Sequence, residues 1–166
     1  MIRNAKTLPC LGSYLAILFF SNTSHADILT IIIDPNALPY EMGPSNYDNS
    51  PSNYDNSSSN YANSGSNYGN SPSNYDNSPS NYENRVGGGR NLVTEDGKAL
   101  GYYVFSDGGA VNFYNYNSHR IAYLPSGGHT QSVFSESGWC GTIGETRNGL
   151  VLGISNSCYY QFLMKN

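Results

Sequence analysis

Residues 44–85 read PSNYDNS-PSNYDNS-SSNYANS-GSNYGNS-PSNYDNS-PSNYENR, six heptads in a row that we call the heptad tract. Each heptad keeps Ser-Asn-Tyr and a second Asn in the same places, so one tyrosine recurs every seven residues among small polar side chains. One large apolar group per heptad buries too little surface to offset the entropy lost on ordering the chain. We therefore expect the heptad tract to be disordered and to act as a tether.

Two ordered forms compete with disorder. A coiled coil needs two apolar positions per heptad, and the prolines at positions 44, 51, 72 and 79 break helices. A solenoid of very short repeats relies on inward-pointing aliphatic residues, which the heptad tract lacks. The composition instead favours turns and polyproline-like chain, with regularly spaced Tyr and Asn side chains available for weak multivalent adhesion or self-association.

The first 26 residues have the three parts of a secretory signal peptide. Arg3 and Lys6 are the basic part, residues 11–20 are an apolar run too short for an anchor, and residues 24–26 (SHA) are a cleavage site. We expect cleavage before Asp27, no transmembrane segment afterwards, and a secreted, periplasmic or cell-surface location.

The expected mature chain keeps two cysteines, Cys140 and Cys158, in a compartment that permits disulfides. We predict a bridge between them that stabilises the fold by about 3 kcal/mol. The alternative makes Cys140 a catalytic nucleophile with His119 or His129 as its base, which requires a free thiolate.

Charge argues against nucleic acid as a partner. Loss of Arg3 and Lys6 leaves six basic residues against twelve acidic ones, so the chain lacks the basic footprint that phosphate backbones require.

Residues 28–33 (ILTIII) predict a strand that Pro35 ends, because β-branched residues dominate this run. We expect it to pair with the protein's own C-terminal domain. Donation to another subunit is the alternative.

The region after the heptad tract alternates β-type runs with Gly-rich turns, and Asn148-Gly149 is its clearest hairpin signal. The fold class that this pattern predicts is all-β, a small antiparallel meander closed as a barrel or sandwich. The last strand is expected at residues 159–164, and the disulfide is expected to join adjacent strands. The expected strands cover residues 92–93, 100–105, 110–116, 120–124, 130–134, 139–146, 150–155 and 159–164.

Aromatic residues exceed what one small core can hold. The two-residue period of a strand places Tyr114, Tyr116 and Asn112 on one face, with Phe113 on the other. An exposed Tyr-Asn face stacks against sugar rings or anchors a protein, so these three residues are the candidate ligand-binding site. Cross-strand tyrosine pairs that only stabilise the sheet are the alternative.

We predict no catalytic, cofactor-binding or metal site. Glu136 and Glu145 are expected to be solvated acids, and His119 and His129 lie in loops without further ligands nearby.

The expected organisation is a signal peptide (1–26), an N-terminal strand and linker (27–43), the disordered heptad tract (44–85) and a small β domain (86–166). The expected function is that of a secreted or cell-surface, non-enzymatic protein in which the heptad tract tethers a small disulfide-stapled β binding module, with adhesion as an additional role. Its partner is a protein or glycan at a cell surface, with self-association through the heptad tract or residues 28–33. An extracellular polymer or coat subunit and a small secreted hydrolase are the alternatives.

Overall fold

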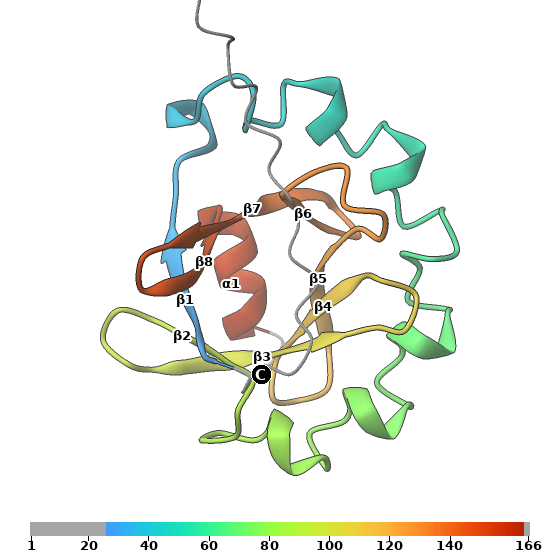
Figure 1. Ribbon diagram of the computed structural model, residues 1–166, viewed down its shortest axis with the longest axis vertical. Helices are drawn as coiled ribbons and strands as arrows, with labels where there is room; N and C mark the ends of the chain where they lie inside the picture. The colour runs from blue at the N-terminus through green and yellow to red at the C-terminus, as the bar shows by residue number, and fades with distance from the viewer. Residues whose placement is uncertain (1–25, 165–166) are drawn as a thin grey trace, which may run out of the picture.

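The computed structural model describes residues 26–164 (Figure 1). The predicted signal peptide lies outside the described residues except for Ala26. Eight strands form a closed barrel in the order of the sequence, and one α-helix follows them. Their bounds are β1 (Ile28–Ile32), β2 (Asn91–Val93), β3 (Ala99–Phe105), β4 (Val111–Tyr114), β5 (Arg120–Leu124), β6 (Ser132–Ser135), β7 (Gly138–Thr146), β8 (Gly149–Ile154) and α1 (Asn156–Met164).

Strands β2 to β8 form the antiparallel meander that the turn signals predict. The β7–β8 hairpin turns at Arg147-Asn148, with Thr146 opposite Gly149. Gly149 has a φ of 120°, which a glycine adopts without steric cost.

β1 is the exception that makes the barrel mixed. It lies between β2 and β8 and runs parallel to both, with Ile28 beside Leu92 and Ile32 beside Ile154. Its docking on the protein's own domain is confirmed, and both of its edges are hydrogen-bonded. Because β1 and β2 are parallel neighbours, the chain between them must cross over the outside of the barrel. The heptad tract is that crossover.

The C-terminal segment is helical, so the predicted strand at residues 159–164 is wrong. Ser155 precedes the helix, and its Oγ accepts a hydrogen bond from the Cys158 N–H at 3.3 Å, as an N-cap does. Cys158 and Phe162 of α1 join the core of the barrel. The predicted bridge between Cys140 and Cys158 is present, but it ties β7 to α1 and not to an adjacent strand.

The heptad tract is ordered, contrary to the expectation of disorder. Five of its heptads contain a short 3₁₀-helix, and the heptad around Tyr61 makes a turn with the same backbone hydrogen bonds. In Figure 1 the heptad tract runs down the right-hand side, against the barrel. The 3₁₀-helices are η2 (Tyr47–Asn49), η3 (Tyr54–Asn56), η4 (Tyr68–Asn70), η5 (Tyr75–Asn77) and η6 (Tyr82–Asn84), preceded by η1 (Pro35–Ala37).

None of the helices in the described part of the chain has the length and apolar character needed to cross a membrane.

Candidate functional site

Each heptad folds by local hydrogen bonds, as the second one illustrates. The Asn53 side chain accepts from the Asp55 N–H at 3.1 Å and so caps the turn. The Asn56 N–H then donates to the Asn53 carbonyl, and the Ser57 N–H donates to the Tyr54 carbonyl, both at 3.0 Å. These bonds close one 3₁₀ turn per heptad.

The second Asn of each heptad ties successive turns together. Asn56 Nδ2 donates to the carbonyls of Asp48 and Ser50, eight and six residues earlier, at 2.8 and 3.0 Å. All six of these asparagines are only 0–6 % exposed and make the same pair of bonds. We call them the asparagine ladder: Asn49, Asn56, Asn63, Asn70, Asn77 and Asn84.

The asparagine ladder also provides acceptors for the barrel. Three ladder carbonyls accept hydrogen bonds from tyrosine hydroxyls on the outer face of the strands, at 2.7–2.9 Å. The pairs are Tyr123 with Asn56, Tyr114 with Asn70 and Tyr102 with Asn77. Since Tyr123, Tyr114 and Tyr102 lie on β5, β4 and β3, the heptad tract crosses the strands in reverse order.

Arg120 joins the barrel to the middle of the heptad tract. Its Nη1 donates to the Asn63 carbonyl at 2.8 Å, and its Nε donates to Asn112 Oδ1 at 2.6 Å. Its guanidinium lies 4.5 Å from the centre of the Tyr123 ring. Burial of this group lowers the pKa of Arg120 from its usual value. Asn112 Nδ2 in turn donates to Asn70 Oδ1 at 3.0 Å, so the network is continuous.

The predicted exposed face of Tyr114, Tyr116 and Asn112 is therefore wrong as a surface. Tyr114 and Asn112 are 0 % exposed, because the heptad tract covers β4. Tyr116 is half-buried and donates to Asn91 Oδ1 at 2.8 Å. The alternation itself is correct, since Phe113 points into the barrel core. Tyr114 stacks on Tyr102 with 5.3 Å between ring centres, which is the cross-strand pairing considered as the alternative.

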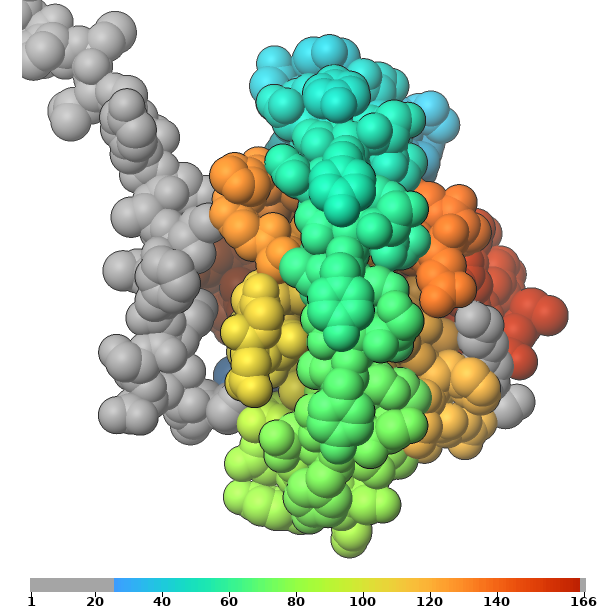
Figure 2. Space-filling model, turned by 90° about the vertical axis from the view of Figure 1, so that its right-hand side faces the viewer, coloured from blue at the N-terminus to red at the C-terminus, as the bar shows by residue number. Residues whose placement is uncertain are grey.

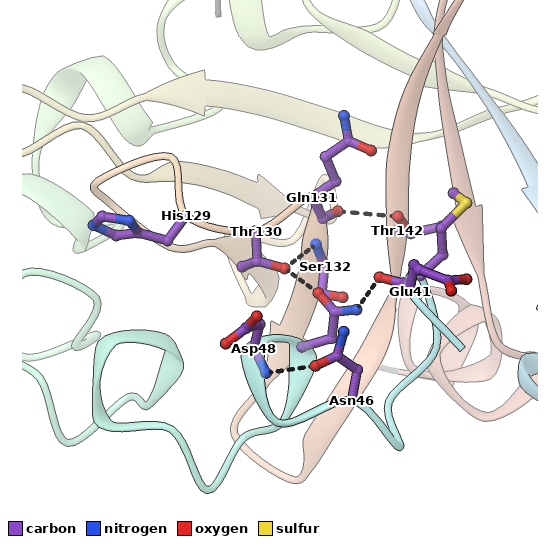
Figure 3. A pocket seen from close by; sticks show the side chains of 10 residues that line it. Glu41, Asn46, Asp48, His129, Thr130, Gln131, Ser132 and Thr142 are labelled. Atoms are coloured by element: carbon purple, nitrogen blue, oxygen red, sulfur yellow. Dashed lines mark hydrogen bonds between the residues drawn. The ribbon is translucent and has the colours of Figure 1, made fainter. Parts of the chain in front are cut away.

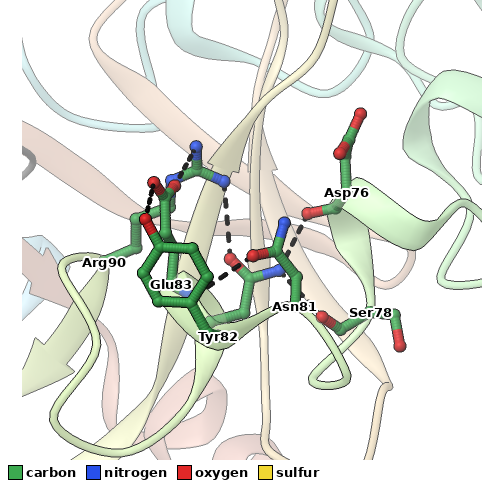
Figure 4. Close-up of polar contacts among 7 residues, drawn as sticks. Asp76, Ser78, Asn81, Tyr82, Glu83 and Arg90 are labelled. Atoms are coloured by element: carbon green, nitrogen blue, oxygen red, sulfur yellow. Dashed lines mark hydrogen bonds and ion pairs between the residues drawn. The ribbon is translucent and has the colours of Figure 1, made fainter.

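Polar contacts fix both ends of the heptad tract. At the first heptad, Thr130 donates to Asn49 Oδ1 at 2.7 Å, beside a polar pocket of about 200 Å³ whose lining includes Glu41 and His129 (Figure 3). At the last heptad, Glu83 forms an ion pair with Arg90, as Figure 4 shows.

The outward side of the heptad tract presents its six tyrosines, which we call the tyrosine row. Their side chains are 61–72 % exposed. In Figure 2 the heptad tract runs from top to bottom, with aromatic rings along its middle. Tyr82 donates to Glu83 at 3.2 Å, whereas the other five hydroxyls make no hydrogen bond among the described residues. The members are Tyr47, Tyr54, Tyr61, Tyr68, Tyr75 and Tyr82.

The sequence repeat indicates the tyrosine row. Each tyrosine has the same position in its heptad, so all six point in the same direction when every heptad makes the same turn. The sequence indicates these tyrosines as adhesive groups, but the expectation of disorder does not place them in an ordered row.

The residues considered for catalysis or metal binding do not form one centre. Cys140 cannot be a thiolate nucleophile, because its sulfur is bonded to Cys158. Glu136 and His119 line a second pocket, whereas His129 lies beside the first heptad and Glu145 is exposed on β7. Residues 26–164 contain no group of three or more His, Cys, Asp or Glu side chains placed to hold a metal ion.

Comparison of the chain with protein-family models, with curated proteins and with solved structures finds no match.

Proposed function

We propose that the protein is a secreted, non-enzymatic adhesive protein that binds an extended glycan chain along the tyrosine row. The observation that carries this proposal is the exposure of six tyrosines at one fixed place in each turn of an ordered tract. Exposed aromatic side chains that gather along one face mark an interaction site, whereas single scattered ones do not. Tyrosine is also suited to that task, because it has an apolar ring and a polar tip.

Order in the heptad tract favours tight binding. The asparagine ladder holds every turn in the same geometry, so ligand binding does not have to order the backbone. Six equivalent rings on one scaffold also act together, because each contact after the first is intramolecular.

The periodicity and charge of the row indicate the ligand class. A ligand built from repeating units meets the same ring in each heptad, as a polysaccharide does. Acidic residues follow four of the six tyrosines, and they repel phosphate backbones. The acidic residues are Asp48, Asp55, Asp76 and Glu83. A glycan has hydroxyls for the free phenol groups and ring C–H faces for stacking.

Export supports the same function, since residues 1–26 have the composition of a signal peptide. Assembly into a polymer through residues 28–33 loses its main support, because β1 is paired on both sides within its own barrel.

The test compares glycan-array retention of the wild-type protein with that of the double variant Tyr61→Ala, Tyr68→Ala. Each lost ring is expected to weaken binding by about 1 kcal/mol, or roughly fivefold, with an almost unchanged melting temperature because both rings are exposed. A matched control is Tyr40→Ala with Tyr160→Ala, which removes two exposed tyrosines outside the row. Equal retention by the wild type and the row variant, or equal loss in the control, would contradict the proposal.

A further inference from the structure

A second pocket, of about 560 Å³, flanks the middle of the heptad tract. Gly65 and Pro72 of the tract form one side. Arg120 and Ile121 of β5 form another, with Glu136 from the β6–β7 turn and Gln161 from α1. The pocket therefore lies where three parts of the fold meet, and the tyrosine row is on the outer side of the same heptads.

The repeat departs from its usual sequence where it borders this pocket. Gly65 occupies the first heptad position, which is proline in four of the six heptads. A Cβ atom at Gly65 would lie 3.8 Å from Arg120 Nη1 and from Glu136 Oε1, an ordinary contact distance. Packing therefore does not require glycine here. By contrast, a Cβ at Gly69 would lie only 3.2 Å from Ser106 Oγ, so a side chain there would displace this hydroxyl slightly.

The missing side chain has a chemical consequence. The ring of a proline at position 65 would extend past Cβ into the space in front of Arg120 and Glu136. With glycine, both charged groups border the pocket. Gly65 thus leaves the pocket open at a heptad position that carries a proline ring in four of the other five heptads.

The pocket has fixed donors and acceptors. Arg120 lines the pocket and is held in place by hydrogen bonds to Asn63 and Asn112. Glu136 forms no ion pair with it in this part of the chain. A sugar hydroxyl both accepts and donates, so it satisfies a guanidinium and a carboxylate at the same time.

An apolar group completes the site. Half-buried Pro72 lines the same pocket, and it offers a surface for the C–H face of a ring. We propose that this pocket binds a single saccharide ring, with Arg120 donating to its hydroxyls and Glu136 accepting from them.

This inference takes its ligand class from the proposed function, so its test separates the two. Saturation-transfer NMR is recorded with D-glucose, D-galactose, N-acetyl-D-glucosamine and D-glucuronate, one at a time, on the purified protein. We expect at least one of the four to bind with millimolar affinity. The variants Gly65→Pro and Glu136→Gln are each expected to weaken that binding about tenfold, which corresponds to about 1.4 kcal/mol.

A matched control accompanies these variants. Glu145→Gln removes an exposed acid on β7, away from the pocket. It is expected to bind the sugar as the wild type does. Thermal melts confirm that every variant is folded.

Absence of a saturation-transfer signal with all four sugars, or unchanged binding in folded Gly65→Pro protein, would overturn the pocket inference. Either result leaves the proposed function standing if the tyrosine-row variant still loses glycan-array retention. Conversely, sugar binding that depends on Gly65, together with unchanged array retention in the tyrosine-row variant, would keep the pocket and remove the tyrosine row as the binding face.

Discussion

The protein contains two sets of tyrosines that differ in what their hydroxyl groups do. The inner tyrosines of the barrel each donate to a fixed acceptor, and they are buried or half-buried. The tyrosine row is exposed, and five of its hydroxyls have no partner among the described residues. Tyrosine therefore stabilises the fold on one side of the heptad tract, and on the other side it is available for binding. The inner tyrosines are Tyr102, Tyr103, Tyr114, Tyr116 and Tyr123.

The asparagines of the heptad tract also form two sets, the buried asparagine ladder and the asparagines that cap each turn. Replacing a ladder asparagine is expected to lower the free energy of unfolding more than any other change considered below. Asn70→Ala removes two donated bonds, to Ala62 and Ser64, and the acceptor for Asn112. Buried groups that lose their partners cost about 1–3 kcal/mol each, so we expect a loss of about 3 kcal/mol or more in the free energy of unfolding. Urea unfolding measures it.

The control for that variant is Asn74→Ala, which removes a single capping bond to the Asp76 N–H. Its expected cost is about 1 kcal/mol. Equal costs for the two asparagines would show that the ladder bonds do not hold the turns together.

Removing a single hydroxyl group is expected to change stability less, and the change should differ between the two sets of tyrosines. Tyr114→Phe leaves the Asn70 carbonyl without its 2.7 Å hydrogen bond, and we expect a loss of about 1–2 kcal/mol. Tyr68→Phe, in the tyrosine row, removes an exposed hydroxyl and is expected to change stability by less than about 0.5 kcal/mol. If Tyr68→Phe costs as much as Tyr114→Phe in the same melts, the division between the sets fails.

Alkaline pH is expected to act through the inner tyrosines. Burial raises the pKa of Tyr102 and Tyr114 above that of a free phenol, and it raises the pKa of Tyr116 to about 12. The folded state thus favours the neutral phenol. Its contribution is complete below the unfolded value of about 10 and is lost as the pH rises toward the folded value. The free energy of unfolding should fall between about pH 10 and 12.

The variant Tyr116→Phe should reduce this fall, because it removes one of the titrating groups. A decline that is equally steep in the variant would mean that Tyr116 does not contribute to the pH dependence.

Local patterns predicted most of the barrel, because strand alternation and turns depend on near neighbours. The hairpin that Asn148-Gly149 predicts is present, with Arg147-Asn148 as its turn, and Phe113 points inward as predicted. The parallel docking of β1 depends on pairing across the whole chain, which local patterns do not encode. α1 was missed because Tyr159, Tyr160 and Phe162 resemble a strand, although Ser155 caps a helix there.

The expectation of disorder in the heptad tract is wrong because it considers only the apolar surface that each heptad can bury. Its turns are held by buried amide groups, and Asn70 alone takes part in four hydrogen bonds to other heptads or the barrel. The same error misplaced the candidate site, since an ordered tract buries Tyr114 and exposes its own tyrosines. The burial of Tyr114 and the exposure of the tyrosine row both depend on the packing of the heptad tract against β4, which local sequence patterns do not show.

Hydrogen exchange measures directly whether the heptad tract is ordered in solution. The backbone N–H groups of Asn56, Asn63, Asn70 and Asn77 each donate to a carbonyl within an ordered turn. We predict that they exchange far more slowly than an unstructured chain, with protection that approaches the global stability of the barrel. Exchange at the rates of an unstructured chain in the folded protein would show that the heptad tract is a disordered tether and not an ordered crossover.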